Sequence, residues 1–152
     1  VGCTAWPMLG APHGYTLNLA DIATEEKFAN IYPHRELLDA GVPMANHSDA
    51  PQATLWPWSG MEATITRGVP GDPDIPKLGA HQALTLEETL KVHTINGAWI
   101  LRLDDVTGSI EEGKWADMIV LDRDLFEIPV TEIHETQVLT TVFKGEVVYK
   151  AE

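Results

Sequence analysis

The segment Gly41-Val42-Pro43-Met44-Ala45-Asn46-His47-Ser48-Asp49-Ala50-Pro51 decides the fold of this chain. Glycine, here Gly41, commonly ends a helix because it adopts the left-handed conformation readily. Residues 42–46 form a short apolar run that predicts a buried strand. The strand leads to Asp49 and then to a proline turn. In a parallel α/β barrel, catalytic groups lie at the C-terminal ends of the strands. A carboxylate there can bind a metal or move a proton, although carboxylates also follow strands in ordinary loops.

The residues before this segment predict further structure of the same kind. Residues 1–20 are apolar and rich in turn residues, which predicts the end of a strand and then a long loop. Thr24 precedes two acidic residues and is a suitable N-cap for a helix. A second helix is predicted from Pro33 to Ala40, and Gly41 ends it.

The residues after the segment predict three helices separated by a long loop. Residues 59–67 predict a helix that ends at Arg67. Glycines and prolines interrupt residues 68–84, and this loop is either a functional surface or a surface excursion without a role. Thr85 and Glu88 have the spacing of a capping box, which predicts a helix that ends near residues 96–97. A second short helix is predicted over residues 98–103.

The pattern changes after residue 104, where β-strand signals dominate. Strands are predicted over residues 118–121, 138–143 and 147–149. Lys144-Gly145-Glu146 predicts a hairpin turn between the last two. We therefore predict an α/β domain over residues 1–104 and a β-rich domain over residues 105–152.

Composition narrows the possible partners and compartments. The chain has 152 residues, 44% of them apolar, and a net charge of −13. This charge disfavours nucleic acids and anionic membranes as partners. No stretch approaches the roughly 20 apolar residues of a membrane span. Cys3 is the only cysteine, so no internal disulfide forms, and we expect a reducing, cytoplasmic location.

Several side chains near the opening segment are candidates for a substrate site. If the strand continues, His47 and Asp49 point to the same face, and His47 either shares a site with Asp49 or is a buried imidazole bonded to the backbone. Arg67 either complements the helix dipole or binds a substrate carboxylate. Trp56, like Trp58, either lines an apolar pocket or packs in a core or interface.

The six histidines do not form a metal-binding motif by themselves. No pair has the His-x-His or His-Glu-x-x-His spacing that brings two imidazoles to one metal. No Cys-x-x-Cys pair, phosphate-binding glycine loop or Gly-x-Ser-x-Gly turn is present either. We therefore do not expect a self-contained metal site.

Two segments together resemble the C-terminal part of the metal-dependent amidohydrolase superfamily. The first is His47-Ser48-Asp49-Ala50-Pro51. The second is Thr94-Ile95-Asn96-Gly97-Ala98 followed by Gly108-Ser109-Ile110-Glu111-Glu112-Gly113-Lys114-Trp115-Ala116-Asp117-Met118-Ile119-Val120-Leu121-Asp122. The resemblance extends from about Pro33 to the end of the chain and looks strongest to the branch of N-substituted formamide deformylase-like hydrolases.

This resemblance implies a fold and a function. Such proteins have a (β/α)8 TIM barrel and a small β-sandwich built from both chain ends. The chain then holds the last strand-helix units of the barrel and the C-terminal part of the sandwich. Asp49 is implied to be a metal ligand, with zinc as the expected metal, and the general base in hydrolysis of a C–N bond in an amide or cyclic amide. His47, Trp56 and Arg67 are the candidates for binding the small-molecule amide substrate.

The chain also departs from the superfamily pattern. The His-x-His of the first strand, the bridging Lys or Glu and the later histidines are absent, and we expect them upstream of Val1. The position before Ser48, often glycine in the superfamily, is His47. We therefore expect association with a missing N-terminal barrel portion or with another copy of the chain. The alternative is a non-catalytic fragment or assembly module that lacks the metal-binding histidines.

Overall fold

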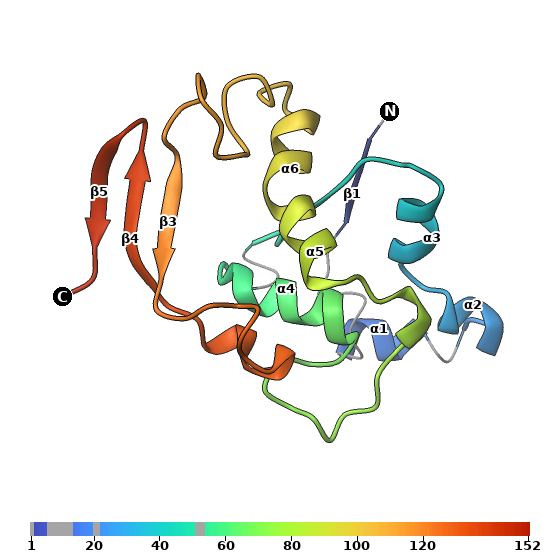
Figure 1. Cartoon of the computed structure of the whole chain (residues 1–152). Helices are drawn as coiled ribbons and strands as arrows, with labels where there is room; N and C mark the ends of the chain where they lie inside the picture. Colours follow the sequence, from blue (N-terminus) through green and yellow to red (C-terminus); the bar gives the residue numbers. More distant parts are fainter. Residues whose placement is uncertain (1, 6–13, 20–21, 51–53) are drawn as a thin grey trace.

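The chain is an α/β structure with two small sheets. The computed structural model describes residues 2–5, 14–19, 22–50 and 54–152. Within these ranges, helices gather around a two-stranded parallel sheet, and a three-stranded antiparallel sheet lies to one side (Figure 1). The predicted α/β class is therefore confirmed. A closed barrel and a sandwich both require further strands and stay predictions.

The parallel sheet pairs the N-terminal strand with the strand of the opening segment. β1 (Cys3–Ala5) runs parallel to β2 (Met44–Asn46), with Thr4 opposite Ala45. Parallel neighbours need a long crossover connection, usually helical. Here the connection carries α1 (Gly14–Asn18), α2 (Glu25–Ala29) and α3 (His34–Asp39). Met44 and Ala45 are buried as predicted, but the strand is shorter than residues 42–46.

The loop predicted for residues 1–20 is only partly correct. Residues 14–18 form α1 instead, and residues 6–13 and 20 lie outside the described ranges. α1 has five residues, too few to leave a clear hydrophobic period in the sequence. Intrinsic propensity also contributes little to the stability of so short a helix.

The helix caps agree with the sequence prediction. The Thr24 hydroxyl accepts a hydrogen bond from the Lys27 amide at 3.3 Å. In the capping box, Thr85 Oγ1 accepts from the Glu88 amide at 3.2 Å, and Glu88 Oε2 accepts from the Thr85 amide at 2.8 Å. Glu88 also forms an ion pair with Arg35 of α3, so the capping box ties two helices together. Hydrogen bonds from Arg35 lower the pKa of Glu88 to about 2.

α4 and α6 begin earlier than predicted, and α5 ends at His93 rather than near residues 96–97. α4 (Pro57–Thr66) starts at Pro57, which is favoured in the first helical turn. α5 (Leu86–His93) is followed at once by α6 (Ile95–Ile100), because only Thr94 leaves helical geometry between them. The long loop before α5 contains the short 3-10 helix η3 (Ala80–Gln82).

The C-terminal region forms the three-stranded sheet in the order β3-β4-β5. These strands are β3 (Met118–Leu121), β4 (Val138–Phe143) and β5 (Glu146–Lys150), all antiparallel. Lys144 and Gly145 both have positive φ, as a tight hairpin turn requires. One element was not predicted: the 3-10 helix η4 (Val130–Glu135), which packs its buried Ile133 against α4.

Two apolar clusters hold these elements together. One joins Ala5 and Met44 of the parallel sheet to Leu84 and Val92. The other joins Trp58 and Met61 of α4 to Leu125 and Ile133. The second cluster contains residues from both sides of the predicted domain boundary at residues 104–105, so the C-terminal region packs directly on α4.

The turn at Gly108 fixes α6 against the loop that leads into β3. Gly108 has φ +91, and a Cβ there would lie 2.6 Å from the Ala98 Cβ. Only glycine allows this approach at this backbone angle. The close contact therefore explains why glycine stands at position 108.

Among the described residues, no helix combines the length and the apolar character that spanning a membrane requires.

Candidate functional site

Asp49 follows the parallel strand but does not belong to it. β2 ends at Asn46, and Asp49 has φ +52. Asp is one of the few residue types that adopts this left-handed conformation readily, and such outliers cluster at functional sites. The side chain is exposed. Because the strand has ended, the alternation that would place His47 and Asp49 on one face does not apply.

A small pocket lies beside this turn. Its volume is about 160 Å³. It is bounded by the end of β2, the residues that lead into α4, and the end of α5. The lining residues are Asn46, His47, Ser48, Thr54, Leu55, Trp56, Pro57, Gly60 and His93. We call this the strand-end pocket. Two of the predicted substrate-binding residues, His47 and Trp56, line it together.

His47 is exposed, so the alternative of a buried imidazole is wrong. Its backbone amide donates to Ala5 O at 2.9 Å, which extends the parallel pairing by one bond. The next residue inward, Asn46, donates from Nδ2 to Thr64 Oγ1 at 3.1 Å, while its buried Oδ1 has no partner among the described residues. The main chain around His47 is thus fixed while its ring faces solvent.

Trp56 stands at the N-terminus of α4 and is 38% exposed. Its indole Nε1 donates to His134 O at 3.0 Å, so a distant part of the chain holds the ring in place. Trp58 is 4% exposed and belongs to the core cluster. The two alternatives that the sequence left open therefore separate: Trp56 lines the pocket, and Trp58 packs in the core.

His93, the last residue of α5, is half-buried. Its Nδ1 lies 2.8 Å from Thr89 O. Because a carbonyl only accepts, Nδ1 carries the proton and Nε2 keeps a lone pair in the neutral ring. Burial lowers the pKa of His93, which favours the neutral form. Sequence reasoning missed that His93 shares the strand-end pocket, because only the fold brings α5 to the end of β2.

Arg67 does not face this pocket. Its side chain is fully buried, and the guanidinium donates to Leu78 O at 3.0 Å, Ile31 O at 2.9 Å and Tyr32 O at 3.3 Å. Burial lowers its pKa to about 10. With its donors committed to backbone carbonyls, Arg67 fastens two loops to α4. The structure does not support the prediction that it binds substrate.

A buried carboxylate and a histidine form a pair that sequence reasoning also missed. Glu62 of α4 is 2% exposed, and its Oε2 lies 2.7 Å from His134 Nδ1 and 2.9 Å from the His134 amide. The available signal was a lone acid between Met61 and Ala63 in an apolar helix, since such a residue is rarely buried without a partner.

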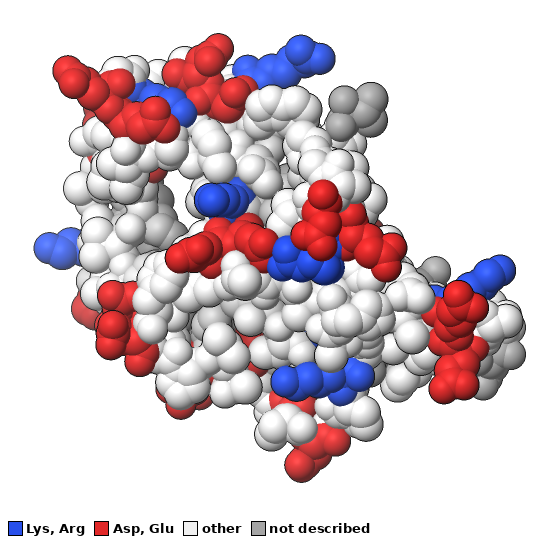
Figure 2. All heavy atoms as spheres, turned by 45° about the vertical axis from the view of Figure 1, so that its right-hand side comes forward, with Lys and Arg blue, Asp and Glu red and all other residues white. Residues whose placement is uncertain are grey.

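The other histidines lie away from the strand-end pocket. His81 bonds Asn30 Oδ1 at 2.7 Å, and His34 is the buried first residue of α3. His13 lies outside the described residues. Within the described part of the chain, no three His, Cys, Asp or Glu side chains gather in a group that holds a metal. Figure 2 shows acidic side chains spread over the visible face with basic ones among them, rather than a basic patch.

Comparison with known proteins defines the class. A model of the amidohydrolase family matches residues 8–149. An N-substituted formamide deformylase from Arthrobacter pascens is 35% identical over 129 residues. The chain therefore belongs to the amidohydrolase family, as the two sequence segments implied. The match covers 82% of this chain but 22% of the deformylase, so the chain spans about a fifth of the length of this relative.

Solved structures show the same fold. An uncharacterized metal-dependent hydrolase from Pyrococcus horikoshii OT3 superposes with a TM-score of 0.70 at 23% identity, covering 86% of this chain and 26% of that one. An adenosine deaminase from Xanthomonas campestris with bound zinc gives a TM-score of 0.59 at 22% identity, covering 78% of this chain and 30% of that one.

Proposed function

We propose that this chain is part of a metal-dependent hydrolase that cleaves C–N bonds of amides or cyclic amides. The observation that carries the proposal is the family match over residues 8–149 together with the carboxylate that follows β2. In a barrel enzyme this is the position where catalytic groups stand. The similarity to an N-substituted formamide deformylase favours a small-molecule amide as substrate.

The metal needs ligands beyond those that the described residues offer. Asp49 supplies carboxylate oxygens, and the described residues hold no group of three metal-ligating side chains. One carboxylate is too few for the three protein ligands of a catalytic zinc site. We propose that the remaining ligands come from another part of the protein and that zinc is the metal. The zinc-bound deaminase of similar fold supports this choice.

Asp49 is the proposed general base as well as a ligand. A bound divalent ion would lower the pKa of a water molecule toward ~7. With the metal bound, the Asp49 carboxylate would accept a proton from the attacking water and pass it to the leaving nitrogen. Because the Asp49 side chain is exposed, its carboxylate is accessible to both the water and the leaving nitrogen.

His47 and Trp56 are the proposed substrate contacts. Both line the strand-end pocket, and both side chains are exposed there. The imidazole offers hydrogen bonding, and the indole offers apolar area to a substituent on the amide.

The proposed architecture is the end of a TIM barrel over residues 1–104 and part of a β-sandwich over residues 105–152. The parallel β1–β2 pair with its helical crossover supports the first part. The exposed apolar residues of the C-terminal sheet, among them Ile119, Phe143 and Tyr149, support a partner surface. We propose that it packs against the N-terminal barrel portion or another copy of the chain.

The alternative is that these 152 residues act as a non-catalytic module. The absence of a complete ligand group among the described residues favours it for the isolated chain. The two proposals are compatible, because the complete protein and this segment can differ in activity.

The test is Asp49→Asn in the complete protein, assayed on a panel of N-substituted formamides and cyclic amides. Asn also tolerates a positive φ, so the turn is preserved. We expect turnover to fall by about 10²-fold or more, because proton transfer is lost. Asp74→Asn, an exposed loop carboxylate, is the matched control and keeps its activity. Near-normal turnover in Asp49→Asn removes this residue from proton transfer.

A further inference from the structure

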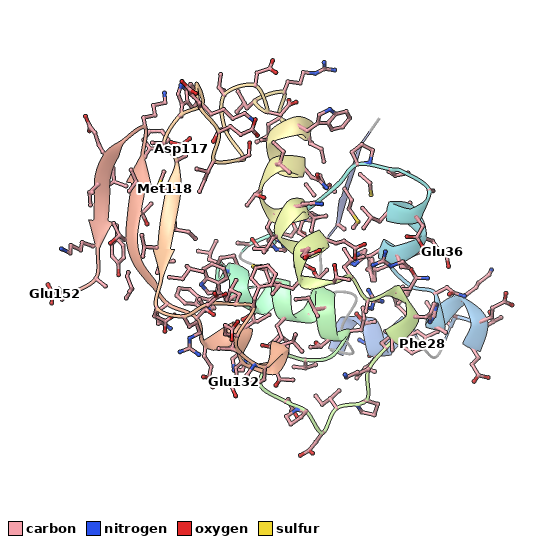
Figure 3. The ribbon with its side chains drawn as sticks, viewed as in Figure 1. Phe28, Glu36, Asp117, Met118, Glu132 and Glu152 are labelled. Carbon is pink, nitrogen blue, oxygen red and sulfur yellow. The ribbon has the colours of Figure 1, made fainter. Side chains whose placement is uncertain are left out.

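Besides the apolar contact of Ile133, the C-terminal 3-10 helix η4 is joined to α4 by hydrogen bonds of one residue, His134. On one side, the His134 amide and Nδ1 both approach Glu62 Oε2, at 2.9 and 2.7 Å. On the other side, the His134 carbonyl accepts from Trp56 Nε1 at 3.0 Å. Figure 3 shows η4, marked by Glu132, beneath α4. One residue is therefore bonded to α4 at two points along that helix.

Glu62 is the fixed end of this attachment. Its side chain is 3% exposed, and His134 provides both of the hydrogen bonds to its Oε2. A buried carboxylate is costly without such bonds. The two donors from one residue meet one oxygen, which fixes the direction of the main chain at residue 134. That direction in turn aims the carbonyl at Trp56.

Trp56 is the other end, and it reaches the strand-end pocket. Its ring is 38% exposed and lines the pocket beside His47. Exposed indoles at a helix N-terminus have several rotamers, and a hydrogen bond at Nε1 selects one of them. The bond to His134 O is the one polar contact described for this ring.

We infer that Glu62 and His134 are positioning residues that hold the Trp56 indole as a wall of the strand-end pocket. The C-terminal region thereby helps to set which substituents the pocket accepts. The geometric part of this inference stands by itself, and its kinetic part rests on the proposed hydrolase function.

The experiment compares two pairs of variants in the complete protein. Glu62→Met and His134→Leu remove the pairing. Glu62→Gln keeps an oxygen acceptor, and His134→Asn keeps an N–H donor where Nδ1 stood. Glu135→Gln is the control, because Glu135 lies on the same 3-10 helix as His134 and its exposed side chain pairs with Arg123, outside that helix.

The first measurement is the NMR signal of the Trp56 indole N–H, identified by its loss in Trp56→Phe. We expect Glu62→Met and His134→Leu to shift this signal and to speed its hydrogen exchange roughly tenfold or more, since a lost bond opens the ring to water. Glu62→Gln, His134→Asn and Glu135→Gln should retain the wild-type signal. An unchanged indole signal in folded His134→Leu overturns the inference.

The second measurement separates KM from kcat. Loss of the indole wall should raise KM roughly fivefold, a change that corresponds to the net free energy of about one hydrogen bond. The value of kcat should stay within about twofold of the wild type. Equal losses of kcat in both removing variants contradict a positioning role. If Glu62→Met does not fold, the His134→Leu and His134→Asn pair decides, because the His134 side chain is 27% exposed. A complete protein without hydrolase activity overturns the proposed function, and the indole signal then decides the positioning by itself.

Discussion

His34 makes the stability of this chain sensitive to mild acid. The side chain is 1% exposed, and neither ring nitrogen has a hydrogen-bond partner among the described residues. Burial, together with the positive charge of Arg67, lowers the pKa of His34 to about 4 from an ordinary 6.5. The folded chain therefore keeps this imidazole neutral at pH values where an unfolded chain protonates it.

The size and direction of the effect follow from this difference in pKa. Between pH 6.5 and 4 the unfolded state binds more protons at this position, so stability falls as the pH falls. Above about pH 6.5 this titration takes nothing from the stability of the folded chain. The loss is about 2 kcal/mol at pH 5 and approaches about 3 kcal/mol below the folded pKa, at 1.36 kcal/mol for each pKa unit.

Urea unfolding at pH 7.5 and pH 5.0 measures this loss. In His34→Leu the apolar side chain has no charge to gain, so we expect its stability to change by about 2 kcal/mol less than that of the wild type between the two pH values. Burial also lowers the pKa of His93, but this group is present in both proteins and cancels in the comparison. The exposed His81→Gln is the control and should follow the wild type. If His34→Leu loses as much stability as the wild type, the argument from His34 is refuted.

Three further perturbations test the remaining structural claims. Arg67→Met should cost about 3 kcal/mol or more in urea unfolding, because it leaves three carbonyls without their donor; a loss below about 1 kcal/mol would contradict the role of the buried guanidinium. Gly108 and Gly113 both have a positive φ, but of the two only Gly108 lacks room for a Cβ. Gly108→Ala should therefore lower stability by about 1–3 kcal/mol more than Gly113→Ala. Equal melting temperatures of the two variants would refute the close contact. Metal analysis of the purified 152-residue chain should find well under one zinc per chain, because Asp49 alone is too small a ligand set; tight one-to-one zinc would contradict this.

Local signals in the sequence predicted the elements but not their contacts. The capping box at Thr85 and Glu88, the end of α3 at Gly41 and the hairpin at Gly145 are written in neighbouring residues, and the structure confirms all three. The predicted starts of helices were less accurate. α6 begins at Ile95 rather than at residue 98, because Thr94 alone separates it from α5. The helix η4 was missed because its reason to form, the burial of Ile133 on α4, lies outside its own sequence.

The candidate site shows the same division. Proximity in sequence was enough to place His47 and Trp56 near one another, and both line one pocket. The long-range contacts of Arg67 with Ile31 and Tyr32 could not be read from residues around position 67. The pairing of Glu62 with His134 also depends on tertiary packing, so only a lone acid in an apolar helix hinted at it.

The turn at Asp49 changes how the carboxylate should be understood. A residue on a strand is aimed by the pleat, so its neighbours two positions away share its direction. β2 ends at Asn46, and the φ of +52 at Asp49 means that the turn, rather than the pleat, aims this side chain. A substitution that disfavours positive φ, such as Asp49→Val, would therefore disturb direction and charge together. Asp49→Asn changes the charge alone, and for this reason it isolates proton transfer and metal ligation from the geometry of the turn.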